Sequence, residues 1–122
     1  FRLLQKNFHL VFFLFRTTTK RKGLPFPLFP NLLAQAAFAL DLMAACKRYG
    51  IHLALETSGF GKREDLLALA DAADCLFYDV KHADDDVHRE LTGQGCGLIL
   101  DNLDAVLDRA ARKLTVRMPL IP

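Results

Sequence analysis

The sequence predicts an α/β protein in which short parallel strands alternate with helices in a partial (βα) barrel. Strand-like apolar runs recur at intervals of about 25 to 35 residues with helical segments between them, the pattern of repeated βα units. The strands are short and two of them end in polar residues. This favours a barrel whose ligands gather beyond the carboxyl ends of its strands, although periodicity alone also fits an open parallel sheet.

Four runs have strand character. The first covers residues 8–15, which are rich in aromatic and aliphatic side chains. The other three are shorter, and the last is stopped by Pro119; they cover residues 51–55, 75–78 and 114–118.

Helical patterns fill the spaces between the later strands. Residues 33–49 place Phe38, Leu42, Cys46 and Tyr49 at spacings of three to four, and Lys47 and Arg48 precede Gly50 as stop signals. The other expected helices are amphipathic or begin with acidic residues; they cover residues 63–73, 87–91 and 98–112.

Composition divides the chain near Pro30. The chain has 122 residues, of which 52% are apolar and 25% charged, as expected for one globular domain. Residues 1–40 carry six basic residues and no acid, whereas the rest of the chain carries 10 bases and 14 acids. Seven of the ten Phe lie within residues 1–30, and 17–30 contains three prolines, which indicates loop or disorder. We therefore expect an unassigned segment at 1–30 and a partial barrel domain at 31–122.

The most informative features are two polar clusters that follow strands. Glu56-Thr57-Ser58-Gly59 ends one apolar run, and Tyr78-Asp79-Val80-Lys81-His82 ends the next. Charged residues at the carboxyl ends of parallel strands favour a ligand site over a solvated edge. A structural ion pair between Asp79 and Lys81, and an ordinary turn at 56–59, are the competing interpretations.

Six sequence blocks resemble a known family. They read AACKRYGIH (44–52), LETSGF (55–60), FYDVKH (77–82), HRELTG (88–93), LILDNL (98–103) and VRMPLIP (116–122). In this order and spacing they resemble the glycyl-radical-enzyme activating proteins of the radical S-adenosylmethionine superfamily, which include the pyruvate formate-lyase activating enzyme. The resemblance implies a partial βα barrel, S-adenosylmethionine and a [4Fe-4S] cluster as cofactors, and a 5′-deoxyadenosyl radical that takes a hydrogen atom from a glycine of the partner.

The resemblance also implies site residues. Asp79 and Lys81 match a DxK pair, with Val80 between them, that contacts the methionyl part of S-adenosylmethionine. Arg117 stands where a strand-end arginine faces the same cavity. Glu56 and Thr57 match residues that in some members help to hold a monovalent cation. We expect Asp79 and Lys81, two apart on a strand, to point to the same side and to bind the ammonium and carboxylate of an amino acid group.

The chain departs from the family in two places. It contains no CxxxCxxC motif, and its three cysteines, Cys46, Cys75 and Cys96, lie far apart. Residues 29–33 stand where a Gly-Gly-Glu-Pro motif is expected. The chain begins at Phe1 without Met and ends at Pro122 just after a strand, so we interpret it as a fragment, with no metal ligands or catalytic residue of its own, that does not catalyse radical formation.

Three other features have plain interpretations. His82 and His88 lie beside an acidic run and are expected to be solvated, and Cys96 between two glycines is expected to be exposed. Asp84-Asp85-Asp86 reads as the acidic start of a helix.

Partners and location follow from the resemblance and the composition. The expected partner is a glycyl radical enzyme, with flavodoxin or ferredoxin as electron donor, in an anaerobic cytoplasm. Three basic residues at 20–22 are weak evidence for nucleic acid, and the apolar run at 8–15 is shorter than the roughly 20 residues that cross a bilayer, so neither nucleic acid nor a membrane is expected.

Two other functions stay open on the sequence alone. Lys81 and Asp79 also fit a Schiff-base barrel lyase, with Lys81 as nucleophile. A non-catalytic remnant or interaction module with exposed apolar surface and open sheet edges fits the incomplete barrel.

Overall fold

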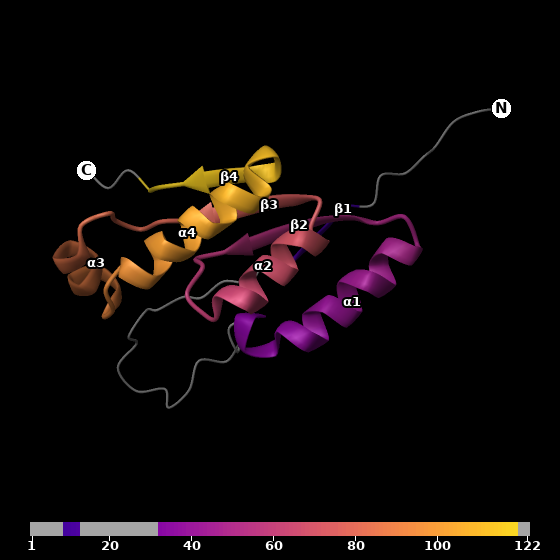
Figure 1. Cartoon of the computed structure of the whole chain (residues 1–122), viewed down its shortest axis with the longest axis horizontal. Helices are drawn as coiled ribbons and strands as arrows, with labels where there is room; N and C mark the ends of the chain where they lie inside the picture. Colours follow the sequence, from indigo (N-terminus) through magenta and orange to yellow (C-terminus); the bar gives the residue numbers. More distant parts are fainter. Residues whose placement is uncertain (1–8, 13–31, 120–122) are drawn as a thin grey trace.

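The structure, a computed structural model, describes residues 9–12 and 32–119 (Figure 1). The expected boundary near Pro30 and the predicted loop at 17–30 lie outside the described residues. Within them, no helix combines the length and apolar character that a bilayer crossing requires.

The centre of the described fold is a four-stranded parallel sheet. The strands lie in sequence order and are β1 (His9–Phe12), β2 (His52–Thr57), β3 (Cys75–Asp79) and β4 (Leu114–Arg117). Parallel neighbours bring the carboxyl ends of all their strands to one edge of the sheet. The two polar clusters of the sequence therefore lie on the same side of the molecule.

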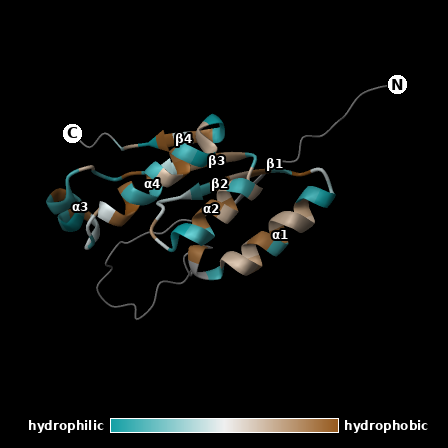
Figure 2. Ribbon diagram, viewed as in Figure 1, coloured by the Kyte–Doolittle hydropathy of each residue, from teal (hydrophilic) through white to brown (hydrophobic). Residues whose placement is uncertain are grey.

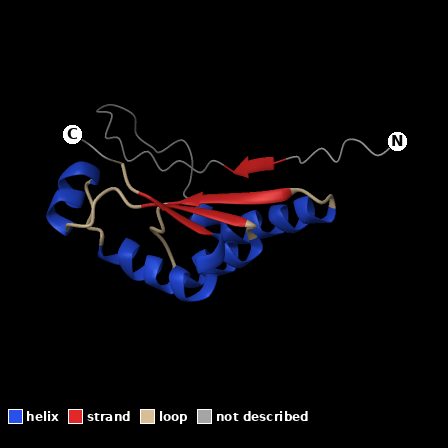
Figure 3. Cartoon of the chain, turned by 90° about the horizontal axis from the view of Figure 1, so that it is seen from above, coloured by secondary structure: helices blue, strands red, loops and turns tan. Residues whose placement is uncertain are grey.

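Helical segments connect the strands. They are η1 (Leu32–Gln35), α1 (Ala36–Arg48), α2 (Arg63–Ala72), α3 (Asp85–Thr92), α4 (Gly97–Ala110) and η2 (Ala111–Lys113). The helices α1, α2 and α4 all lie on one face of the sheet (Figure 3). Sequential strand order with helices on a single face is the arrangement of a (βα) barrel, since a doubly wound sheet carries helices on both faces. The predicted partial barrel is confirmed in this form.

The core lies between the sheet and these helices, where Leu53, Leu55, Leu76, Leu66 and Val106 are at most 2% exposed. The helices carry hydrophobic and hydrophilic residues in alternation along their length (Figure 2). This is the pattern of helices that bury one side and expose the other.

The predicted apolar stripe of α1 is confirmed for two of its four positions: Cys46 is buried and Leu42 packs against the core. Phe38 is 65% exposed and Tyr49 is 83% exposed, while the buried side is made of Ala36, Ala39, Met43 and Cys46. The predicted end of the helix is confirmed, because α1 ends at Arg48 and Gly50 follows with φ of 70°. The sequence therefore predicted where this helix ends, but it predicted only in part which of its sides packs against the core.

Candidate functional site

An ion cluster joins three strands at their carboxyl ends. Arg117 Nε donates a hydrogen bond of 2.7 Å to Asp79 Oδ1, and Arg117 Nη2 donates to the Glu56 carboxylate. The guanidinium carbon lies 5.3 Å from the centre of the Phe77 ring, within cation–π range. We call Glu56, Phe77, Asp79 and Arg117 the Arg117 cluster.

Register explains why these side chains meet. Glu56 is the partner of Phe77 across β2 and β3, and Asp79 is the partner of Arg117 across β3 and β4. Because side chains two apart on a strand share a face, Phe77 and Asp79 point the same way. The hydrogen bonds that Arg117 donates to Asp79, and then to Glu56, raise the pKa of Arg117, so the guanidinium is charged at any working pH.

Lys81 extends the cluster towards solvent. Its Nζ lies 3.6 Å from Asp79 Oδ2 and its side chain is 46% exposed. Strand β3 ends at Asp79, so the expectation that Asp79 and Lys81 share one strand is wrong; the turn after the strand brings the two charges together.

Thr57 and Val80 are not brought into the cluster. Thr57 is buried, and its Oγ1 accepts the Gly59 N–H at 3.0 Å. Val80 is 2% exposed, and its backbone N–H donates to the Arg117 carbonyl at 3.0 Å. Thr57 Oγ1 is thus bonded within its own turn and one Glu56 oxygen to Arg117, and the monovalent cation that the resemblance implies stays a prediction.

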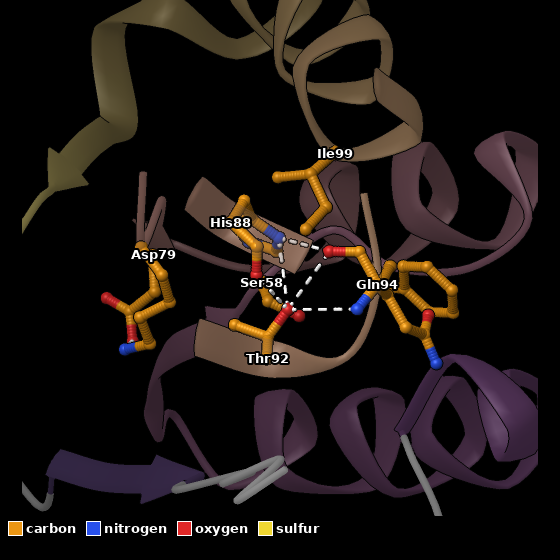
Figure 4. A pocket seen from close by; sticks show the side chains of 8 residues that line it. Ser58, Asp79, His88, Thr92, Gln94 and Ile99 are labelled. Carbon is orange, nitrogen blue, oxygen red and sulfur yellow. Dashed lines mark hydrogen bonds and ion pairs between the residues drawn. The ribbon is translucent and has the colours of Figure 1, made fainter. Parts of the chain in front are cut away.

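An open pocket lies beside Asp79 and Lys81 (Figure 4). It encloses about 380 Å³, counting the solvent space in its mouth, and is lined by Ser58, Phe60, Asp79, Lys81, His88, Thr92, Gln94 and Ile99. Asp79 lies apart in Figure 4, while His88, Thr92 and Gln94 form a hydrogen-bonded group. The pocket thus has one end with charged side chains, Asp79 and Lys81, and another end with a hydrogen-bonded polar group.

The polar end is a self-contained network on α3. His88 is 3% exposed, and its Nδ1 lies 2.7 Å from the Gln94 carbonyl. A carbonyl only accepts, so Nδ1 carries the hydrogen. The expectation that His88 is solvated is wrong, because α3 turns this side towards the pocket and the loop at 93–96 folds back over it.

Cys96 is also buried, contrary to expectation. It is 2% exposed, its Sγ lies 3.3 Å from the Ala83 carbonyl, and its N–H donates to Asp85 Oδ1 at 2.7 Å. The flanking glycines suggested exposure, but the hydrogen bond to Asp85 and the left-handed turn at Gly93 hold the loop against α3.

The sequence reasoning missed Asn102 and Tyr78. Asn102 is fully buried and donates to the carbonyls of Gly59 and Gly61, at 2.8 Å and 3.0 Å. The Tyr78 hydroxyl donates to the Ile99 carbonyl at 2.7 Å, and burial raises the pKa of Tyr78. The available signal was an amide within the apolar stripe of the predicted helix at 98–112.

The described residues do not fit an iron–sulfur cluster. Among them, no three His, Cys, Asp or Glu side chains are grouped so that they hold a metal ion. Cys46 lies in α1, Cys75 in β3 and Cys96 immediately before α4, and all three are free thiols. S-adenosylmethionine fits better, because its amino acid group requires an anion and a cation side by side, and Asp79 and Lys81 supply both at a pocket mouth.

The sequence is similar to those of known activating enzymes. The chain is 42% identical over 91 residues to the choline trimethylamine-lyase activating enzyme of Oleidesulfovibrio alaskensis, a match that covers 75% of this chain and 29% of that protein. It is 37% identical over 84 residues to the trans-4-hydroxy-L-proline dehydratase activating enzyme of Clostridioides difficile, covering 69% and 28%. No protein-family model matches the chain.

A solved structure agrees with these relatives. A domain of a pyruvate-formate lyase-activating enzyme from Bacteroides vulgatus superposes with a TM-score of 0.66 at 26% identity, covering 76% of this chain and 57% of that one. The charged strand ends thus lie on a fold that is shared with activating enzymes.

The parallel sheet and the relatives together define the class of this chain as a partial barrel of the radical S-adenosylmethionine type. Within that class, this chain is a member of the glycyl-radical-enzyme activating proteins. It spans 29% and 28% of the length of these two curated relatives.

Proposed function

We propose that this chain supplies the strand-end part of the S-adenosylmethionine site of a glycyl-radical activase. The observation that carries the proposal is Asp79 beside Lys81 at the mouth of a pocket, at the carboxyl ends of parallel strands. The similarity to activating enzymes supports it.

Each charged residue has a distinct part in this proposal. Asp79 Oδ2 faces Lys81 and accepts from the ligand ammonium, while Lys81 pairs with the ligand carboxylate. Arg117 acts from behind, because it binds the other oxygen of Asp79 and so fixes the orientation of that carboxylate. Glu56 holds Arg117 in turn.

We also propose the activity of the whole activase to which this chain contributes. When bound at a reduced [4Fe-4S] cluster, S-adenosylmethionine supplies the means to abstract a hydrogen atom from a partner glycine. We propose a glycyl radical enzyme as the partner and flavodoxin or ferredoxin as the electron donor, in anaerobic cytoplasm. The described residues bind and orient the cofactor but hold no cluster, so we expect this chain alone to bind without catalysis.

The Schiff-base alternative is not favoured. A nucleophilic lysine is activated by desolvation, whereas the Lys81 side chain is 46% exposed and paired with a carboxylate. The relatives are named as activating enzymes rather than as lyases. The same similarity disfavours a non-catalytic interaction module.

Calorimetric titration with S-adenosylmethionine tests the proposed site. Wild-type chain should bind, and Asp79→Asn and Lys81→Ala should each weaken binding by about tenfold or more, the equivalent of one charge-assisted hydrogen bond. Asp71→Asn and Lys47→Ala are matched controls, because they break the Asp71–Arg109 and Lys47–Asp74 pairs elsewhere. Equal affinities in both sets of variants, or no binding by the wild type, would overturn the proposal.

A further inference from the structure

A buried amide ties α4 to the loop between β2 and α2. Asn102 is 0% exposed, and both hydrogens of its Nδ2 are used, one for the Gly59 carbonyl and one for the Gly61 carbonyl. Its Oδ1 faces Arg63 Nε at 3.4 Å. A buried amide with this many partners is fixed in one orientation.

The loop that Asn102 holds is a wall of the pocket. The two bonded carbonyls stand on either side of Phe60, and Phe60 and Ser58 both line the pocket that contains Asp79. Within the loop itself, the Gly59 N–H donates to Thr57 Oγ1. Asn102 therefore joins this loop to α4 by two hydrogen bonds.

Helix α4 contributes to the pocket one turn earlier as well. Ile99 lines the pocket directly, and its carbonyl accepts the Tyr78 hydroxyl from β3 at 2.7 Å. The same helix thus carries one pocket residue and holds both the strand that leads to Asp79 and the loop that bears Phe60. Their relative positions depend on α4.

We propose that Asn102 is a positioning residue for the ligand pocket: by holding the carbonyls of Gly59 and Gly61 it sets the position of the Ser58–Phe60 wall relative to Asp79. The inference rests on the proposed function for the identity of the ligand, but the anchoring of the loop stands on the contacts of Asn102 alone. A purely structural asparagine would affect stability without changing ligand affinity in the folded chain.

Hydrogen exchange measured by mass spectrometry tests the anchoring. In Asn102→Ala, the amides of residues 58–61 should exchange at least about tenfold faster, while those of β3 stay protected. Asn102→Asp keeps the acceptor for Arg63 but turns a carboxylate towards two carbonyls, so it should also free the loop at neutral pH. When the carboxylate of the Asn102→Asp variant is protonated at low pH, its O–H can donate to one of the two carbonyls again. After correction for the pH dependence of intrinsic exchange rates, the loop of Asn102→Asp should therefore regain protection as the pH falls. The loop of Asn102→Ala should not.

Two further variants serve as controls. Asp101→Ala changes an exposed neighbour on α4, and Arg63→Ala removes only the partner of Oδ1, so both should keep the loop protected. If Asn102→Ala does not fold, the pH series of Asn102→Asp carries the test. Unchanged loop exchange in both Asn102 variants would overturn the proposal.

The affinity for S-adenosylhomocysteine separates positioning from simple stabilisation. Asn102→Ala should weaken binding by about fivefold or more at a temperature where circular dichroism shows it folded, because the loop must be ordered when the ligand binds. A freed loop with wild-type affinity would overturn the positioning role. If the wild type binds no ligand, the proposed function fails, and the exchange experiment still decides whether Asn102 fixes the wall.

Discussion

Within residues 9–12 and 32–119, the buried polar side chains are held by hydrogen bonds. Among the described residues, no buried side-chain nitrogen or oxygen lacks a hydrogen-bond partner. Tyr78 is the largest of the fully buried side chains, and its hydroxyl is bonded to a backbone carbonyl of α4. The hydroxyl therefore links β3 to α4. If the hydroxyl is removed, water cannot reach the buried Ile99 carbonyl to replace the lost hydrogen bond.

Tyr78→Phe should lower the free energy of unfolding by about 1 to 2 kcal/mol, the cost of a lost buried hydrogen bond. Burial raises the pKa of Tyr78 above its ordinary value of 10.0, so the folded state holds this proton more tightly than the unfolded state does. That contribution to stability is complete below about pH 10 and is lost as the pH rises further. Stability of the wild type should therefore fall more steeply above about pH 10 than that of Tyr78→Phe.

Urea unfolding followed by circular dichroism, at neutral and alkaline pH, measures both effects. Tyr49→Phe is the matched control, since Tyr49 is 83% exposed and its removal should change neutral-pH stability by less than about 0.5 kcal/mol. Parallel pH profiles for wild type and Tyr78→Phe would contradict the assignment.

The loop between β2 and α2 depends on a close approach of backbone and ring. Gly59 has φ of 69°, and a Cβ there would lie 1.6 Å from the Tyr78 hydroxyl oxygen. Gly50, after α1, has nearly the same φ of 70° but has nothing within 4 Å of such a Cβ. An alanine at either position meets the same backbone strain, but only at position 59 does it also overlap with a neighbouring side chain.

Gly59→Ala should cost about 3 kcal/mol or more, because a displaced Tyr78 ring or loop adds to the strain of a left-handed residue. Gly50→Ala should cost only about 1 kcal/mol, the strain alone. Urea midpoints of the two variants give the comparison, and equal costs would mean that the loop moves away from the ring without penalty.

The elements show what the sequence could and could not predict. Strand ends, helix ends and the charged clusters were predicted because Gly50, Pro119 and the residues at 56–59 and 78–82 act locally. The buried side of α1 was predicted only in part, because the helix packs through small residues such as Ala36 and Ala39 and leaves the more apolar Phe38 exposed.

Asn102 was missed as a site residue because its two carbonyl partners, in the loop between β2 and α2, lie 43 and 41 residues away in the chain, which no local pattern reports. His88 was missed although its partners Thr92 and Gln94 are local, because it is the fold of the loop after α3 that buries its ring.

The charges of the whole sheet converge on Arg117. Residues 56, 79 and 117 are far apart in the chain, but β2, β3 and β4 lie in one sheet (Figure 1). The guanidinium of Arg117 joins the ends of these three strands. The Glu56 side chain is only 9% exposed, whereas that of Arg117 is 40% exposed. Water therefore solvates Arg117 in part, whereas the Glu56 carboxylate is compensated mainly by its hydrogen bond from Arg117.

Arg117→Met should destabilise the chain by about 2 kcal/mol, because it leaves the buried Glu56 carboxylate without its cation; partial exposure keeps the cost below that of a fully buried pair. Adding Glu56→Gln to Arg117→Met should recover about half of this loss, since a neutral amide costs less to bury than a lone carboxylate. Arg109→Met, which breaks the exposed pair with Asp71, should cost less than about 1 kcal/mol. Urea unfolding of these variants together with Glu56→Gln alone completes a double-mutant cycle and measures the coupling between positions 56 and 117. Additive losses at positions 56 and 117 would show that the strand ends are held together by backbone pairing alone.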